Sequence, residues 1–218
     1  MKIKIFLTLS VFLILTVSTR SFAEMRTFIR DYTYQASEVD SKQSCRIIAT
    51  EQVKRLLLEE LGTYLESHTE VVNYQLTKDQ ITTLTAGVVK TQLLDEKWDG
   101  EKYWMKAKID ADPDEVAKEI EKLRSDRKKV KELEESRKKT DDTMKDMEDI
   151  RKDVEHDKDN QEKIDKYNKK VQSLKLIQAM AESFRALQTG ATDKAMGSLF
   201  DMMEILIQPS PGNEGSRR

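Results

Sequence analysis

The chain has 218 residues, with 38 Lys and Arg against 40 Asp and Glu. Once its leader is removed the balance is 35 basic to 40 acidic residues, and an acidic chain lacks the basic surface that nucleic-acid binding requires. Its single cysteine excludes an internal disulfide. Seven glycines and two histidines form no phosphate-binding loop and no zinc-ligand spacing.

Residues 1–23 have the pattern of a secretory signal peptide. Two lysines precede an apolar run at 5–18, and the small residues Ser21 and Ala23 stand where signal peptidase cleaves. The run is shorter than the ~20 residues needed to span a bilayer, which argues against a retained anchor. We therefore expect cleavage after Ala23, no integral membrane anchor in the mature chain, and export, most simply to a bacterial periplasm.

Residues 24–112 are predicted to form a small α+β domain. Alternation predicts a strand at 25–37, and apolar residues at three- and four-residue steps predict a helix over 38–66. That apolar stripe contains Cys45, Ile48, Ala49, Val53, Leu56, Leu57, Leu61, Tyr64 and Leu65. Cys45 could bridge two chains, but its place in the stripe favours a buried thiol. A second strand is expected at 69–76. A short helix should follow, with Thr77 as its cap and Gly87 as its stop.

Two further strands are expected at 88–98 and 101–110, around Asp99-Gly100. Asp-Gly between alternating runs is a strong signal for a β-hairpin, because the tight turn requires a positive φ. In the last strand, one predicted face consists of Tyr103, Met105, Ala107 and Ile109. A long helix on a three- or four-stranded antiparallel sheet makes a two-layer α+β domain.

The junction after this strand has the spacing of a calcium loop. Its acids fall at EF-hand positions: Asp110, Asp112, Asp114 and Glu121. However, Glu115 occupies the position that requires glycine, and a strand precedes the loop where an EF-hand has a helix. We therefore predict Asp112 as a helix N-cap with Pro113 as the first helical residue, and no metal site.

Residues 113–170 are predicted to be a charged helical or coiled-coil arm, with helix continuing to about residue 187. Apolar residues recur at near-heptad spacing: Val116, Ile120, Leu123, Val130, Leu133, then Met144, Met147, Ile150, Val154, and finally Ile164, Tyr167, Val171 and Leu174. Polar residues interrupt the seam at Arg127, Arg137, Asp157 and Gln161. The arm either joins copies of the chain or stands as a single solvated helix. A continuous arm would reach on the order of 100 Å.

Residues 171–208 are predicted to be a helical hairpin around Gly190, followed by a disordered tail at 209–218. One amphipathic run contains Leu174, Ile177, Met180, Phe184 and Leu187, and the other contains Ala195, Met196, Leu199, Phe200, Met203 and Leu206. These Met-rich helices either pack only on each other or leave a surface for a partner.

Catalytic chemistry finds little support in the sequence. His68 and His156 are both expected to be exposed, and neither is expected to pair with a buried Cys45. We therefore predict no catalytic, cofactor-binding or metal-binding residues. The aromatic hairpin offers an alternative function, in which Trp98, Tyr103 and Trp104 form a face that binds a ligand in the periplasm.

Three stretches resemble a bacterial envelope domain: "ASEVDSKQSCRIIATEQVKRLLLEELGTYLES", "LTKDQITTLTAGVV" and "DEKWDGEKYWMKAKIDADPDEV". They are similar to the N-terminal domain of the flagellar T-ring protein FlgT and to small envelope lipoproteins. The resemblance implies assembly or scaffolding rather than catalysis, and it carries over no functional residue. The terminal hairpin also resembles one degenerate tetratricopeptide unit, with Gly190 at the turn and Ala195 and Met202 near its small-residue positions. We predict an exported, non-enzymatic envelope scaffold with protein partners, a helical spacer and self-association through the coiled coil.

Overall fold

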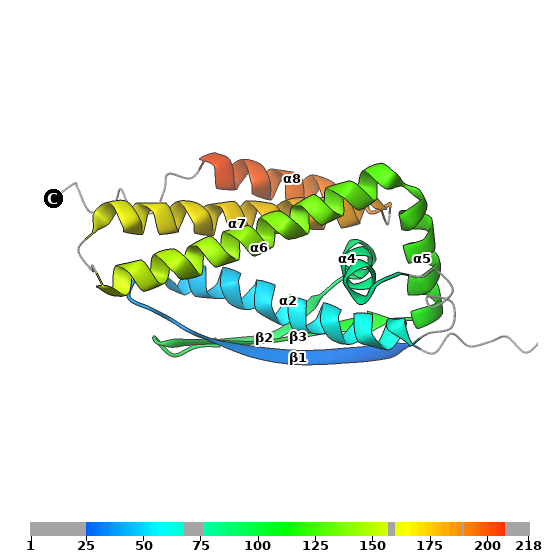
Figure 1. Ribbon diagram of the computed structural model, residues 1–218, viewed down its shortest axis with the longest axis horizontal. Helices are drawn as coiled ribbons and strands as arrows, with labels where there is room; N and C mark the ends of the chain where they lie inside the picture. The colour runs from blue at the N-terminus through cyan, green and yellow to red at the C-terminus, as the bar shows by residue number, and fades with distance from the viewer. Residues whose placement is uncertain (1–24, 68–75, 157–159, 189, 208–218) are drawn as a thin grey trace, which may run out of the picture.

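The computed structural model describes residues 25–67, 76–156, 160–188 and 190–207 (Figure 1). The elements are β1 (Arg26–Gln35), α2 (Lys42–Glu66), α4 (Lys78–Val88), β2 (Gln92–Trp98), β3 (Lys102–Ala111), α5 (Pro113–Ser125), α6 (Arg127–His156), α7 (Gln161–Gln188) and α8 (Thr192–Ile207). The predicted α+β class is confirmed. Among the described residues, no helix is both long and apolar enough to cross a membrane.

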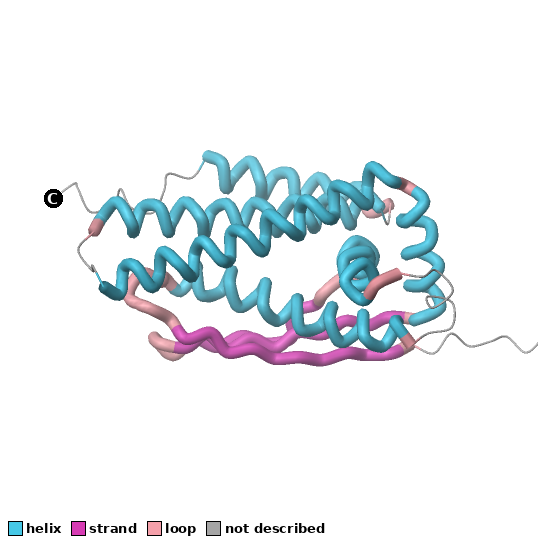
Figure 2. Tube along the Cα trace, in the orientation of Figure 1, coloured by secondary structure: helices cyan, strands magenta, loops and turns pink. Residues whose placement is uncertain are grey.

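The sheet is antiparallel, with strand order β1-β3-β2. The central strand β3 alternates as predicted, and its buried face carries Tyr103, Met105, Ala107 and Ile109. Helix α2 covers this face, while no described helix covers the other one (Figure 2). The strand predicted at 69–76 lies, apart from Leu76, outside the described residues.

The β2–β3 hairpin turns where Asp99-Gly100 predicts. Gly100 has φ 106°, a value that side chains disfavour. The Asp99 carboxylate accepts hydrogen bonds from the backbone N–H groups of Glu101 at 2.9 Å and Lys102 at 2.7 Å. Local turn chemistry therefore sets the register of β2 on β3.

Helix α2 begins four residues later than predicted, because Ser41 and Ser44 form a capping box there. Most of the predicted stripe is buried against the sheet, and Leu56 is its exposed member. The thiol of Cys45 is buried, as predicted. Burial, together with the nearby Asp40 carboxylate, raises the pKa of this thiol to about 12.

Thr77 caps α4 as predicted, but Gly87 does not stop it, since the helix continues through Val88. Gly87 serves a packing purpose instead. A Cβ atom at this position would lie 2.8 Å from Cδ1 of Leu133 on α6. The missing side chain lets α4 and α6 approach each other closely.

The described residues of 113–187 are largely helical, as predicted, but they form three helices and not a single continuous one. Asp126 leaves helical geometry at φ −95° and ψ 88°, and its carboxylate accepts a hydrogen bond from the backbone N–H of Lys129 at 3.2 Å. It therefore ends α5 and caps α6. The arm consists of α5, α6 and the first half of α7, and the predicted boundary at 170/171 falls inside α7.

The arm folds back over the domain instead of extending from it. Helices α6 and α7 lie side by side above α2, with α5 as the connecting end piece (Figure 1). Apolar residues of the predicted seam join the core of the domain: Met147, Ile150, Val154, Tyr167, Val171 and Leu174. The near-heptad pattern is therefore satisfied within one chain.

Candidate interaction surface

Helix α8 carries two parallel apolar stripes, of which α7 covers only one. The covered stripe comprises Ala195, Ser198, Met202 and Ile205, which are buried or half-buried. The second stripe lies about 100° further around the helix, at residues spaced i, i+3, i+4, i+7 and i+10. We call it the outer stripe, and it consists of Met196, Leu199, Phe200, Met203 and Leu206.

The outer stripe faces solvent along its whole length. The exposed fractions of its five residues run from 43% for Leu199 to 70% for Leu206. Taking about 175 Å² for each fully exposed large side chain, the stripe presents about 500 Å² of apolar surface. A patch of this size lies at the upper end of what monomeric proteins expose, and such patches are often functional.

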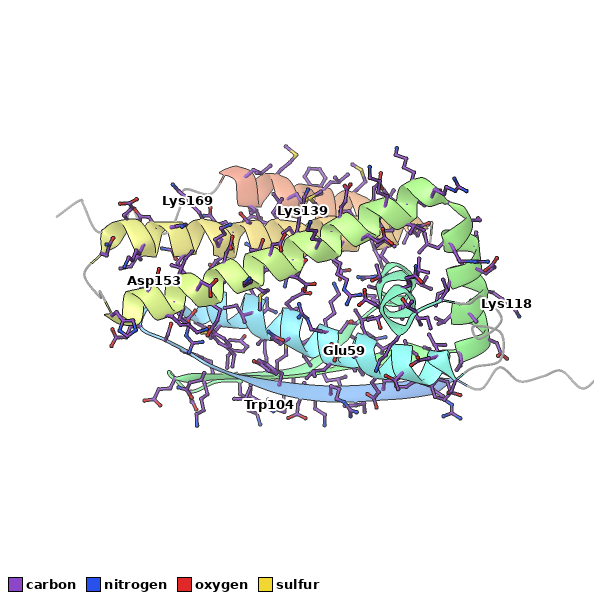
Figure 3. The ribbon with its side chains drawn as sticks, viewed as in Figure 1. Glu59, Trp104, Lys118, Lys139, Asp153 and Lys169 are labelled. Carbon is purple, nitrogen blue, oxygen red and sulfur yellow. The ribbon has the colours of Figure 1, made fainter. Side chains whose placement is uncertain are left out.

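The position of α8 explains why its outer stripe stays uncovered. The α7–α8 turn at Gly190 has φ 70°, and the backbone N–H of Ala191 donates to the carbonyl of Ala186 at 2.8 Å. This turn lays α8 on the side of α7 away from the sheet (Figure 1). Side chains containing sulfur project outward from α8 (Figure 3). The predicted hairpin is confirmed, and α8 forms its outermost layer.

Exposed large apolar residues elsewhere are more scattered. The hairpin itself adds Met180 and Leu187 on α7, exposed to 52% and 64%. The others are Met25, Ile29, Leu56, Leu93 and Leu94, which are distributed over β1, α2 and β2 and their approaches. Among the described residues, apolar exposure is therefore concentrated on α7 and α8.

The charges of α8 indicate what the surface can meet. The helix contains Lys194 and three acids, Asp193, Asp201 and Glu204. Helices that bind anionic lipid surfaces carry many Lys and Arg residues on their polar face. The composition of α8 therefore fits an apolar protein surface better than a lipid headgroup layer.

The structure does not assemble the predicted aromatic face. Tyr103 is buried under α2, with the ring of Trp98 centred 5.9 Å away. Trp104 lies on the opposite face of the sheet (Figure 3), where its indole N–H donates to Asp31 at 3.1 Å. Because neighbouring residues of a strand point to opposite faces, Tyr103 and Trp104 cannot share one ligand.

The Tyr103 hydroxyl, the Glu96 carboxylate and the Arg46 guanidinium form one hydrogen-bonded group. It donates to the Glu96 carboxylate at 2.9 Å, and Arg46 donates to the same oxygen at 2.8 Å. Burial acts to raise the pKa of Glu96, but these two hydrogen bonds hold it below its ordinary value. Burial and the bond to Glu96 raise the pKa of Tyr103. The group ties β2 and β3 to α2.

The acidic junction is a helix start, as predicted. Asp112 accepts hydrogen bonds from the backbone N–H groups of Asp114 at 3.0 Å and Glu115 at 3.4 Å. Asp110 is the penultimate residue of β3, and a hydrogen bond from the Lys108 side chain lowers the pKa of its carboxyl. No group of three or more His, Cys, Asp or Glu residues within the described ranges could hold a metal ion.

The candidate histidines do not join any site in the described part of the chain. His156 is exposed at the end of α6, and His68 lies outside the described residues. Cys45 lies in the first turn of α2, and its buried side chain packs in the hydrophobic core.

A partly buried polar cluster around Asp40 was not predicted from the sequence. The Asp40 carboxylate accepts hydrogen bonds from the hydroxyls of Tyr34 at 3.1 Å and Ser44 at 3.0 Å, and from the N–H and hydroxyl of Ser37 at 2.9 and 2.8 Å. Tyr167 of α7 donates to it as well. Burial and the Asp40 charge raise the pKa of Tyr34 and Tyr167, which keeps both phenols protonated as donors.

The Asp40 cluster, formed by Tyr34, Ser37, Asp40, Ser44 and Tyr167, fixes the folded-back helices in place. It joins β1 and the start of α2 to α7, where Tyr167 is 127 residues from Asp40 in the chain. In the sequence Asp40 stands in a polar run before α2, and such a run does not indicate a long-range partner. The outer stripe, by contrast, was visible in the sequence as an amphipathic run.

Comparison with protein-family models, curated proteins and solved structures finds no match for this chain. The similarity to FlgT-type envelope domains therefore stays a prediction.

Proposed function

We propose that this protein is an exported, non-enzymatic scaffold or assembly component of the cell envelope, and that it acts through the outer stripe of α8. The observation that carries this proposal is the exposure of five large apolar side chains in one line on one helix. Leaving about 500 Å² of apolar surface in water forgoes about 12 kcal/mol of burial free energy, at 25 cal/mol per Å². A partner that covers the stripe would recover a large part of it.

The folded-back arm changes how such a scaffold would work. An extended arm would hold two binding ends far apart, whereas α6 and α7 here place the terminal hairpin on top of the α+β domain (Figure 1). The seam residues that could have joined two chains are buried inside this one. The proposal therefore assigns partner binding to α8 and not to the coiled-coil seam.

Two sequence features support the exported location. The leader at 1–23 has the charge, length and small residues of a signal peptide. The resemblance to envelope domains points to the same compartment. Mass spectrometry of the protein recovered from its native cells tests this directly: we expect a chain beginning at Glu24, and a protein that retains the leader would contradict export.

Photo-crosslinking in cells tests the site. A photoreactive amino acid in place of Phe200 should give a discrete protein adduct. The same group in place of Lys118, an exposed residue of α5 (Figure 3), serves as the matched control and should give none. The adduct should disappear when Met203→Glu is added. A folded protein that gives no adduct from position 200 would refute the proposed function.

A further inference from the structure

We infer that the outer stripe binds a second copy of this chain, through an antiparallel pair of α8 helices related by a two-fold axis. The inference rests on the proposed function, because it names the partner of the same surface. The first support for this pairing is the spacing of the apolar residues in the stripe. Residues at i, i+3, i+4, i+7 and i+10 form one continuous ridge, about 15 Å long, of the kind that packs along another helix.

The ridge is complementary to itself when one copy is reversed. A two-fold axis near residue 201 places Met196 of one copy beside Leu206 of the other. It places Leu199 beside Met203 in the same way. The ring of Phe200 then lies close to the axis in both copies. Every large side chain of the stripe meets an apolar partner, as an isologous interface requires.

The area agrees with a small dimer interface. Two outer stripes of about 500 Å² each would remove about 1,000 Å² from water, the lower bound for a specific association between proteins. An interface of this size predicts a reversible dimer with a dissociation constant well above the nanomolar range. Its population should therefore depend on concentration.

Other occupants fit the outer stripe less well. The tail that follows α8, residues 208–218, contains no large apolar residue and cannot cover the stripe. A lipid surface is disfavoured by the three acids and single lysine of α8. The stripe begins and ends within one helix, so a second α8 matches its length.

Light scattering of the chain from residue 24 onward, at about 1 to 200 μM, tests the inference. The mass should rise toward that of two chains at the upper concentrations. Phe200→Glu should stay monomeric throughout, because an antiparallel pair would bury two like charges near the axis. Lys194→Glu adds an acid to the same helix outside the stripe and should dimerise as the parent does. Circular dichroism of each variant checks that it is folded.

Engineered cysteines test the orientation. In an antiparallel pair, a Leu199→Cys chain should form disulfides with a Met203→Cys chain faster than with itself. The buried Cys45 thiol leaves the engineered thiols as the reactive ones. A preference for 199–199 disulfides would overturn the antiparallel arrangement.

The outcomes separate this inference from the proposed function. If the parent chain stays monomeric at 200 μM while position 200 still crosslinks to another protein in cells, the second copy is excluded and the scaffold function stands. If the dimer persists in Phe200→Glu, association uses another surface and the inference fails. If neither dimer nor adduct forms, both proposals fail.

Discussion

Removing one hydroxyl, by Tyr167→Phe, should measurably loosen the docking of α7 on the α+β domain. Tyr167 is 1% exposed, and its hydroxyl donates to the Asp40 carboxylate. Hydrogen bonds to charged groups contribute about 1.5–3 kcal/mol. Asp40 keeps its donors on Tyr34, Ser37 and Ser44, so we expect a loss near the lower limit, about 1.5 kcal/mol in the free energy of unfolding.

Urea unfolding followed by circular dichroism measures this loss, with the melting temperature as a second readout. For a chain of this size, about 1.5 kcal/mol corresponds to a decrease of about 3–6 °C. The matched control is Tyr32→Phe, a half-buried tyrosine of β1 outside the Asp40 cluster, which should change stability by less than about 0.5 kcal/mol. A double-mutant cycle with Asp40→Asn should show a coupling of at least about 1 kcal/mol between the two positions.

An unchanged stability in Tyr167→Phe, with no coupling to Asp40, would contradict the folded-back arrangement. X-ray scattering gives an independent answer. A compact chain of this length has a radius of gyration of about 17 Å, and a folded-back molecule should stay below about 20 Å. An extended arm on the order of 100 Å would far exceed that value.

Three further changes have defined outcomes. Asp112→Ala should lower the free energy of unfolding by about 1 kcal/mol in urea titrations, because two N–H groups of α5 lose their acceptor, whereas Asp112→Ser should restore most of it. Gly100→Ala should cost about 1–2 kcal/mol because of the positive φ at this turn, and an equally stable variant would contradict that backbone geometry. The thiol pKa of Cys45 is raised from 9.0 to about 12 on folding, so its stabilising contribution is complete below pH 9 and is lost as the pH rises from 9 toward 12. The parent should therefore lose more stability between pH 8.5 and 10.5 than Cys45→Ala does, and parallel pH curves would argue against the buried thiol.

Features determined by near neighbours could be predicted from the sequence. The alternation along β3, the turn at Gly100 and the cap at Asp112 depend on residues within a few positions of each other. The same is true of the amphipathic run on α8. In each case the side chains themselves select the local backbone conformation, so no knowledge of distant contacts is needed.

The direction of the arm could not be predicted in this way. An apolar residue shows that a helix face is buried, but it does not show which surface buries it. Arg137 illustrates the point, because its place in the sequence predicts only a polar interruption of a coiled-coil seam. In the structure its guanidinium donates to the Asp79 carbonyl at 3.0 Å, which joins α6 to α4 across 58 residues. The residue that weakens a seam between chains is one that holds the chain folded back.

The same reasoning gives the outer stripe its meaning. Folding back supplies α6 and α7 with neighbours, so their apolar residues are satisfied inside the chain. Helix α8 needs only its covered stripe, from Ala195 to Ile205, to pack on α7. Yet the larger side chains stand one residue further along, in the stripe that α7 leaves open. A helix that served only to close the hairpin would need polar residues there, for solubility. The apolar residues at these positions are therefore best explained by a partner that covers them.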